Sequence, residues 1–165
     1  MRRAGVRIRR ARLADAREIA AVMSASIRTL ARGSTTPRRI ALWSSLPPLY
    51  HAWAMSVGGE RYVVAGRRGR IDGYAALRGS ELTALFVRPG AARGGIGAAL
   101  LARVEREARR GGATRLRVAA APSALAFYAA MGFRRGRPVS VPLPGGAALP
   151  ARLLSKRIGG RAPPR

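Results

Sequence analysis

A short apolar strand that leads through a glycine-rich turn directly into a helix constrains the fold of this chain more than any other feature. Residues 81–98 read ELTALFVRPGAARGGIGA, with the strand at 81–87 and the turn glycines at Gly94, Gly95 and Gly97. The first N–H groups of a helix lack partners and carry a partial positive charge, and glycine lets an anion approach them closely. The sequence therefore predicts a phosphate or pyrophosphate site at this helix start.

The residues around the turn exclude two common phosphate-binding loops. A P-loop requires Lys followed by Ser or Thr at its end, whereas this turn ends with Ile96, Gly97 and Ala98. A dinucleotide-binding fingerprint requires Gly or Ala at the position of Leu100. The turn instead resembles the acyl-coenzyme A loop of the GNAT N-acetyltransferases, which reads roughly Gln/Arg-x-x-Gly-x-Gly/Ala.

Two motifs in the matching order carry this resemblance. The predicted strand ends with VRP at 87–89, similar to the family's Val-x-Pro, and the loop glycines follow in the corresponding place. Residues 124–133 read ALAFYAAMGF, similar to the family's later A-x-x-F-Y-x-x-x-G-F helix. The resemblance implies a single GNAT domain over residues 1–158, and the remaining residues 159–165 are expected to form a disordered basic tail.

The resemblance implies the fold of that family, an α/β structure with a mixed, mostly antiparallel central sheet and helices on both faces. The hydrophobic periodicity agrees with the order of elements. It predicts strands at 6–12, 61–66, 71–77, 81–87, 114–119, 139–143 and 152–158. It predicts helices that begin near Asp15 and Thr36, and helices at 49–57, 95–110 and 122–131. In the family, the strands that correspond to 81–87 and 114–119 splay apart and admit the pantetheine arm.

Two helix starts carry capping signals. Asp15 and Glu18 have the Asp-x-x-Glu form of a capping box, which predicts that they satisfy the first N–H groups of a helix that Gly33 ends. Thr36 followed by Pro37 predicts an N-cap with proline at the first helical position.

The cofactor-binding motifs depart from the family at two positions. Ala92 stands where the leading Gln or Arg is usual, so the nearest basic residue, Arg93, is expected to contact the phosphates. Ala121 stands where many relatives have an Asn. Ser123 either replaces that contact or caps the helix. The backbone donors of the turn are therefore expected to matter more than side chains.

In the family, backbone groups of the first splayed strand hold the pantetheine arm and polarise the thioester carbonyl, and Phe86 and Val87 match these positions. Attack on a thioester builds negative charge on its oxygen, which a fixed N–H stabilises. Acetyl-coenzyme A is the expected cofactor. The complete set of expected cofactor contacts is Phe86, Val87, Arg93, Gly94, Gly95, Ile96, Gly97, Ala98 and Ser123.

Glu81 and Tyr128 are the candidate proton carriers. Glu81 matches the place where some family members have a carboxylate general base, which acts directly or through water. The alternative is a strand-start carboxylate that pairs with one of many arginines. Tyr128 follows Phe127 where the family often has the tyrosine that protonates the departing thiolate. Its alternative is a core tyrosine with a satisfied hydroxyl group.

The composition limits the chemistry and raises a question about charge. The chain has no Cys and a single His, His51, which excludes disulfides and thiolate ligands and argues against a histidine-based metal site. It has 32 basic and 7 acidic residues, a formal charge of +25. This charge indicates either a polyanionic partner or compositional drift, and the drift is favoured because aromatic residues do not interleave the arginines. The absence of a long apolar run predicts a soluble, cytoplasmic protein without membrane contact.

We therefore predict an N-acetyltransferase that moves an acetyl group from acetyl-coenzyme A to a primary amine of a small molecule, by direct attack in a ternary complex. The alternative is a basic nucleic-acid-binding protein on the same scaffold, with weak or lost transferase activity. The aromatic residues of segment 30–57, which include Trp43 and Trp53, line an acceptor pocket or form core. The positive field favours a neutral or anionic acceptor over a polyamine. A homodimer is compatible with the sequence.

Overall fold

One seven-stranded sheet organises residues 5–159, the part of the chain that the computed structural model describes. The strands are β1 (Arg7–Arg10), β2 (Arg61–Arg67), β3 (Arg70–Arg78), β4 (Glu81–Val87), β5 (Arg115–Ala120), β6 (Arg134–Pro142) and β7 (Ala148–Arg157). The helices are α1 (Ala16–Leu30), α2 (Pro37–Trp43), α3 (Pro48–Ser56), α4 (Ile96–Arg110) and α5 (Leu125–Ala130). The predicted disordered tail lies outside the described residues, apart from Gly159.

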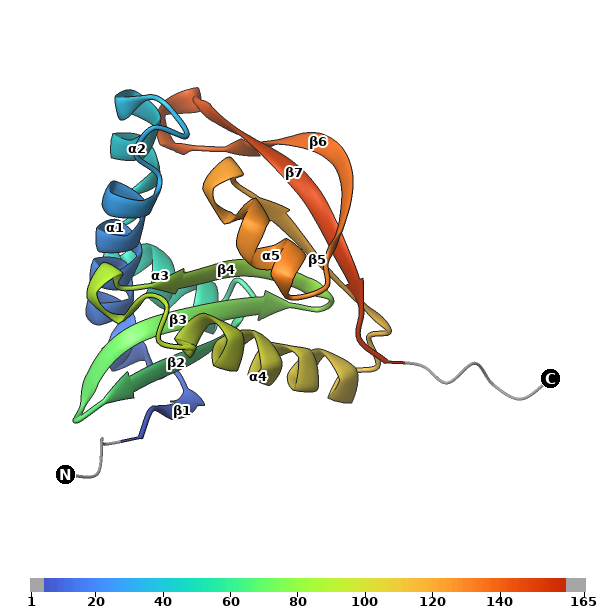
Figure 1. The fold of residues 1–165 in the computed structure, drawn as a ribbon. Helices are drawn as coiled ribbons and strands as arrows, with labels where there is room; N and C mark the ends of the chain where they lie inside the picture. Colours follow the sequence, from blue (N-terminus) through green and yellow to red (C-terminus); the bar gives the residue numbers. More distant parts are fainter. Residues whose placement is uncertain (1–4, 160–165) are drawn as a thin grey trace.

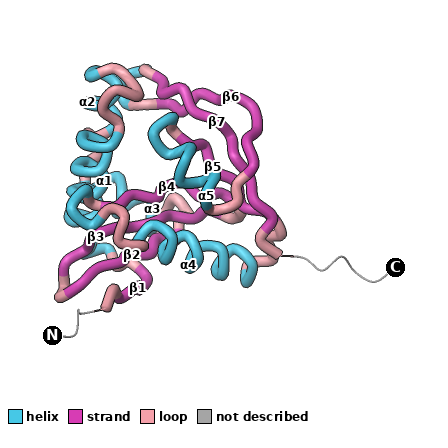
Figure 2. The backbone as a smooth tube through the Cα atoms, in the orientation of Figure 1, coloured by secondary structure: helices cyan, strands magenta, loops and turns pink. Residues whose placement is uncertain are grey.

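Helices cover both faces of the sheet (Figures 1 and 2). On one face, α4 packs through Ile96, Leu100, Val104 and Ala108, which lie four residues apart and are all buried, as their helical spacing predicts. α5 contributes to the same apolar cluster. On the other face, α1 and α3 bury a second cluster around Ile19. The predicted α/β fold with helices on both faces is therefore confirmed.

The sheet consists of two antiparallel halves that meet at a single residue pair. In one half, β1, β2, β3 and β4 pair antiparallel in chain order, and in the other half β7 pairs antiparallel with both β5 and β6. The halves join through parallel strands β4 and β5, whose pairing is limited to Glu81 and Arg117. Beyond this pair the two strands separate, so the sheet is mixed and mostly antiparallel, with a gap that widens toward the ends of β4 and β5.

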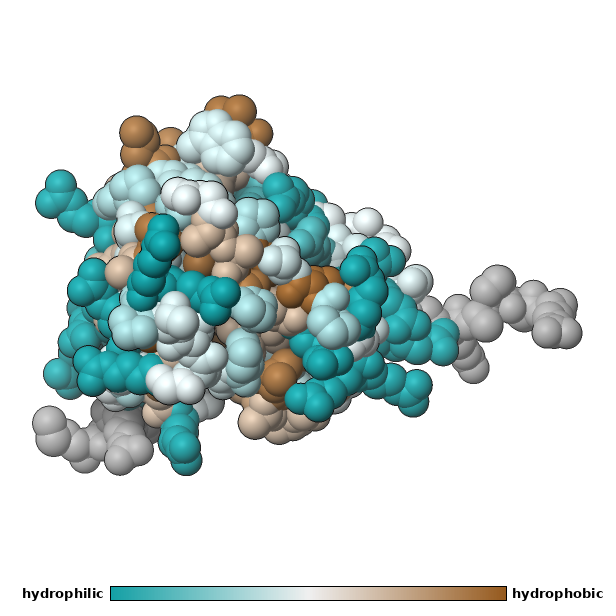
Figure 3. All heavy atoms as spheres, turned by 90° about the horizontal axis from the view of Figure 1, so that it is seen from above, coloured by the Kyte–Doolittle hydropathy of each residue, from teal (hydrophilic) through white to brown (hydrophobic). Residues whose placement is uncertain are grey.

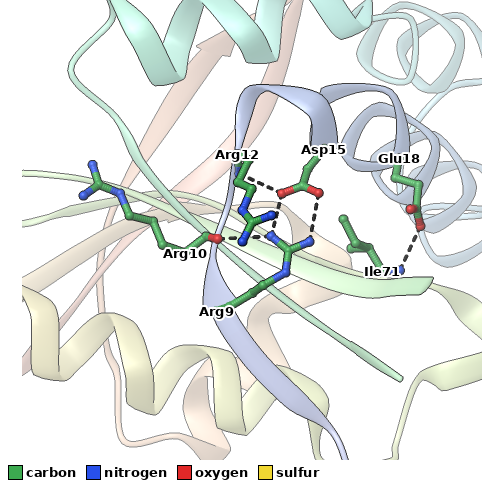
Figure 4. Close-up of polar contacts among 6 residues, drawn as sticks. All are labelled: Arg9, Arg10, Arg12, Asp15, Glu18 and Ile71. Atoms are coloured by element: carbon green, nitrogen blue, oxygen red, sulfur yellow. Dashed lines mark hydrogen bonds and ion pairs between the residues drawn. The ribbon is translucent and has the colours of Figure 1, made fainter. Parts of the chain in front are cut away.

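The capping box predicted for α1 is wrong, because both carboxylates have partners elsewhere (Figure 4). The Asp15 carboxylate accepts hydrogen bonds from the Arg9 guanidinium group at 2.7 and 2.9 Å and from the Arg12 N–H at 2.7 Å. The Glu18 carboxylate accepts a hydrogen bond from the Ile71 N–H of β3 at 2.8 Å. Asp15 therefore caps the 3-10 turn that precedes α1 and ties it to β1, and Glu18 ties α1 to β3.

The N-cap predicted for α2 is confirmed, whereas the predicted bounds of three later elements differ from the structure. The Thr36 hydroxyl accepts a hydrogen bond from the Arg39 N–H at 3.3 Å, so the predicted N-cap of α2 is confirmed. The predicted helix at 122–131 divides into a 3-10 turn at Pro122–Ala124 and the shorter α5. Strands β6 and β7 begin earlier than predicted. Within residues 5–159, no helix combines the length and the apolar character needed to cross a lipid bilayer.

Candidate active site

The turn between β4 and α4 presents unpartnered backbone donors to open space. Arg93 and Gly95 adopt left-handed backbone conformations, with φ of 62° and 80°, and α4 begins one residue after Gly95. The Ala99 N–H donates to the Gly95 carbonyl at 3.0 Å, whereas the N–H groups of Ile96 and Ala98 find no backbone acceptor within the described residues. A side chain at Gly95 would meet no atom within 4 Å. This turn has the geometry of an anion cradle.

Gly97 differs from the other glycines of the turn because it faces protein. A Cβ atom added at Gly97 would lie 3.2 Å from the Phe127 Cε2 atom and 3.8 Å from the Val87 Cγ2 atom. The glycine therefore lets the start of α4 pack closely against α5 and the end of β4. A side chain at position 97 would therefore displace Phe127.

The backbone of β4 divides its polar groups between β3 and the gap. The Arg88 N–H donates to the Asp72 carbonyl of β3 at 2.7 Å. Because bonded and non-bonded residue pairs alternate in an antiparallel ladder, Phe86 directs its N–H and C=O toward Tyr74 of β3. Val87 directs its own polar groups away from β3, into the gap between β4 and β5. Of the two backbone positions predicted from the sequence, only Val87 faces the gap.

Leu85 is a donor position that the sequence analysis missed. It lies two residues before Val87 on β4, so its N–H and C=O also face the gap. Every second residue of β4 directs its N–H and C=O away from β3, and this alternation would have identified Leu85. The Val-x-Pro motif does not show which residues these are, because that depends on the pairing with β3. The Phe86 side chain packs on the face of the sheet that α1 and α3 cover, where its ring centroid lies 5.9 Å from that of Trp43 in α2.

Glu81 occupies the closed end of the gap. It is the first residue of β4, is exposed, and pairs with Arg117 of β5. Six residues of extended strand, about 20 Å, separate it from Val87. The other six carboxylates each form an ion pair, whereas Glu81 forms none within residues 5–159. The ion pair given as the alternative to a base is therefore not formed within the described residues, and the role of Glu81 as a base stays a prediction.

Tyr128 of α5 lies in the apolar cluster on the face of the sheet that α4 covers. Its side chain is 4% exposed and packs edge-on against Phe127 and Phe133, at centroid distances of 5.1 and 5.2 Å. Burial raises the pKa of its phenol above the usual value, so the hydroxyl group keeps its proton at neutral pH. This environment suits both a hydrogen-bond donor to a sulfur atom and a structural tyrosine.

Ser123 and Ala121 lie at the end of β5. Ser123 is exposed in the 3-10 turn, and neither this turn nor α5 has a side-chain cap, so the predicted capping role is not realised. Ala121 is buried with Leu143 and Leu149 in a small apolar cluster. An Asn at this position would bury an amide among aliphatic side chains, which is unfavourable without partners. The departure from the family motif therefore has a local packing reason.

Helix α2 spans the gap on the side opposite α4. Its Trp43 contacts Phe86 of β4 and also packs against the cluster that contains Ala121 at the end of β5. The Arg39 Nε atom donates to the Ala148 carbonyl at the tip of the β6–β7 hairpin, at 2.9 Å. α2 therefore connects both halves of the sheet on this side of the gap.

A cavity of about 240 Å³ lies beside α2. Its lining consists of Gly33, Ser34, Thr35, Thr36, Arg39, Pro122 and Pro150. The Thr35 Oγ1 atom is buried and has no hydrogen-bond partner within the described residues. Segment 30–57 is expected to supply either pocket lining or core, and its aromatic residues differ in burial: Tyr50 and Trp53 are exposed, whereas His51 is buried in the core. Thr35 and Arg39 were missed because no motif marks them.

The comparison with known families decides the identity of the fold. A profile described as an acetyltransferase (GNAT) domain matches residues 44–141, more than half of the chain. The chain belongs to the GNAT acetyltransferase family. A search of curated protein sequences finds no match.

Solved GNAT structures resemble this chain over nearly its full length. A GCN5-related N-acetyltransferase from Rhodopseudomonas palustris is 25% identical, with a TM-score of 0.86 over 95% of this chain and 98% of the other. PaiA N-acetyltransferase from Thermoplasma acidophilum, in complex with coenzyme A, is 18% identical, with a TM-score of 0.75 over 93% and 99%. YncA from Salmonella typhimurium, with its cofactor acetyl-CoA, is 19% identical, with a TM-score of 0.70 over 97% and 98%. These likenesses agree with the GNAT fold of the chain.

The residues of this GNAT chain fit an acyl-coenzyme A molecule on structural grounds. Open donors at the start of α4 suit a pyrophosphate group, and they lie beside the end of β4. The gap between β4 and β5 offers the backbone groups of Leu85 and Val87 to an extended arm. The cradle and Tyr128 lie on one side of the sheet, while Glu81 and the cavity beside α2 lie on the other. An arm that passes through the gap would connect the two sides.

Proposed function

We propose that this protein transfers an acetyl group from acetyl-coenzyme A to a primary amine of a small neutral or anionic molecule, by direct attack in a ternary complex. The observation that supports the proposal most strongly is the position of the open donors of α4 beside the gap between β4 and β5. The family of the chain and the coenzyme A complexes of PaiA and YncA agree with it.

Each residue of the site has a defined task in this proposal. Bound acetyl-coenzyme A supplies an activated thioester carbonyl. The turn N–H groups bind its pyrophosphate, and the gap-facing N–H groups of Leu85 and Val87 supply donors to the arm and to the carbonyl oxygen. Glu81 accepts the proton that the ammonium group of the acceptor must lose. Because about 20 Å of strand separates Glu81 from Val87, the proton reaches it through a chain of several water molecules.

Tyr128 acts on the sulfur side of the reaction. As the amine nitrogen bonds to the carbonyl carbon, the carbon–sulfur bond breaks and the sulfur atom takes up negative charge. The nitrogen releases a second proton as the amide forms, and coenzyme A leaves as the free thiol after its sulfur atom takes up a proton. The Tyr128 hydroxyl group donates a hydrogen bond to this sulfur. Because burial raises the pKa of the phenol, full proton transfer is less favourable than stabilisation through the hydrogen bond.

The cavity beside α2 favours an acceptor that carries a carboxylate. Arg39 directs one guanidinium nitrogen to the Ala148 carbonyl, which fixes the group in the lining and leaves its remaining donors for an anion. The Thr35 hydroxyl group, buried without a partner, offers a second polar contact. No carboxylate side chain lines the cavity among the described residues, so a polycationic amine would find no counter-charge.

A thermal-shift experiment tests cofactor binding first. At one hundred times its dissociation constant, acetyl-coenzyme A should stabilise the fold by about 2.7 kcal/mol, which a melting curve resolves easily. Adenosine diphosphate, which lacks the pantetheine arm, should raise the melting temperature less. An unchanged melting temperature at saturating acetyl-coenzyme A would overturn the proposed function.

A steady-state assay of thiol release then tests the acceptor class. Arg39→Met should raise the KM for an amine that bears a carboxylate by about tenfold, as expected for a lost charged hydrogen bond, and leave a neutral amine unaffected. Arg38→Met, the exposed neighbour on the same helix, is the matched control. Equal effects of both variants, or efficient acetylation of spermidine, would contradict the predicted acceptor class.

A further inference from the structure

The half of the sheet formed by β5, β7 and β6 exposes arginine side chains on one face. Along β5, residues alternate strictly between exposed and buried, so Leu116 and Val118 pack beneath α4 and α5 while Arg115 and Arg117 point the other way. Both arginines are exposed. This exposed side is the same side of the sheet that α1, α2 and Glu81 occupy, and it is opposite to the cradle.

Strand pairing concentrates four arginines on this side. Arg115 of β5 pairs directly with Arg157 of β7. Ser155 of β7 pairs with Arg117 of β5 on one flank and with Arg134 of β6 on the other. Directly paired residues of neighbouring strands project from the same side of a sheet, and the strands lie about 4.8 Å apart. We call Arg115, Arg117, Arg134 and Arg157 the arginine face.

The arginine face lacks compensating acids. All four side chains are exposed, and none forms an ion pair within residues 5–159. The six carboxylates that do form ion pairs lie on η1 (Leu13–Asp15), α1, α4, β3 and the turn before β2. Glu81 is the one carboxylate at the edge of this face, beside Arg117. The hydroxyl group of Ser155 accepts a hydrogen bond from Arg115 at 3.1 Å.

Such a face is unfavourable without a partner. Like charges directly opposite each other on neighbouring strands destabilise a sheet, and Arg115 and Arg157 form such a pair. An anion that contacts both guanidinium groups would remove this repulsion. We infer that the arginine face binds the phosphate backbone of a nucleic-acid duplex, an activity beyond the proposed acetyl transfer.

The chemistry of the face favours a duplex over other polyanions. All four cations are arginines, whose planar guanidinium groups pair with phosphate oxygens in a bidentate manner. No Phe, Trp or Tyr lies on these stretches of β5, β6 and β7, so there is no platform on which the bases of a single strand could stack. The apolar Leu153 on this side is half-buried, which leaves little to insert into a lipid surface.

The position of the face predicts how a duplex and the cofactor relate. The arginine face and the cavity beside α2 lie on the same side of the sheet, whereas the cradle lies on the other. A duplex on this face would therefore leave acetyl-coenzyme A binding intact and lie next to the acceptor side of the gap. Competition between duplex and acetyl-coenzyme A would instead mean that the duplex occupies the cradle, which would overturn the inference.

Fluorescence anisotropy with labelled duplexes of about 20 base pairs, one of DNA and one of RNA, tests the inference across a salt series. Arg115→Gln combined with Arg157→Gln should weaken binding about tenfold and reduce the salt slope by about 2, one for each lost phosphate contact. The matched control is Arg106→Gln combined with Arg110→Gln, which removes the same charge from exposed positions of α4. The control should retain affinity.

Equal weakening by both double variants would show that binding follows the total charge alone and would overturn the assignment to this face. Stronger binding to anionic lipid vesicles than to either duplex would do the same. The thermal shift with acetyl-coenzyme A confirms that each variant is folded. Should the double variant fail this check, Arg134→Gln alone supplies the test, with a slope reduced by about 1.

Discussion

The single histidine of the chain predicts a distinct loss of stability in mild acid. His51 of α3 is 1% exposed and packs edge-on against Tyr62 and Tyr74, at centroid distances of 6.0 and 5.9 Å. Its Nδ1 atom lies 3.3 Å from the Tyr62 hydroxyl oxygen, and its Nε2 atom is buried without a partner within the described residues. Burial lowers the pKa of His51 from 6.5 to about 4. The folded protein therefore holds the imidazole neutral.

The direction of the pH effect follows from which state binds protons. Between about pH 6.5 and pH 4 the unfolded chain protonates His51 and the folded chain does not, so the free energy of unfolding falls as the pH falls. The contribution is fully present above the unfolded pKa. With these two pKa values, about 2 kcal/mol is lost at pH 5 and about 3 kcal/mol once the pH reaches the folded pKa.

Urea unfolding at several pH values between about 7.5 and 5 measures this loss, with His51→Phe as the control. The variant keeps an aromatic ring in the pocket and removes the titration, so its unfolding free energy should change less over this range. Asp15, whose pKa is lowered by the hydrogen bond from Arg9, contributes equally to both proteins. Parallel pH profiles, or a single imidazole NMR signal that titrates near the model-peptide value in the folded protein, would refute the reasoning.

Three further variants test the site. Gly95→Ala should destabilise the protein by about 1 kcal/mol, because φ is 80° at this position, and it should also weaken acetyl-coenzyme A binding. The control Gly90→Ala, at an open position without positive φ, should change neither property. Urea unfolding measures the stability of both variants, and calorimetric titration measures their cofactor affinity. Glu81→Gln should slow turnover about a hundredfold below the amine pKa and recover at high pH, and an unchanged pH–rate profile would remove Glu81 as the base. Tyr128→Phe should lower kcat about tenfold without changing cofactor affinity, and a raised dissociation constant would indicate a structural role instead.

The cradle and α4 could be predicted because their signals are local. Glycines and a strict helical spacing act within one segment, and the structure retains both. The partners of Asp15 and Glu18 could not, because Arg9 lies on the preceding strand and Ile71 comes 53 residues after Glu18. A local pattern cannot weigh such distant donors against the nearby helix start.

The acceptor side was the hardest part to predict. Arg39 and Thr35 meet Pro122 and Pro150 only because α2 docks on the tip of the β6–β7 hairpin, a contact between distant parts of the chain. The early parts of β6 are exposed and rich in Arg, Gly and Pro, so their sequence is typical of a loop although they pair with β7. Pairing partners, not local propensity, make this segment a strand.

Because β4 and β5 pair only through Glu81 and Arg117, the angle between the two halves of the sheet depends on this one point. Beyond this pair, side chains pack on both faces of the sheet beside the gap. On one face, Trp43 packs against Phe86 and the cluster that contains Ala121. On the other face, Phe127 contacts the start of α4 at Gly97. The width of the gap is therefore set by a few side chains instead of by a continuous ladder of hydrogen bonds. A larger or smaller side chain in place of Trp43 or Phe127 would change the distance between cofactor and acceptor, while Glu81 and Tyr128 would stay in place.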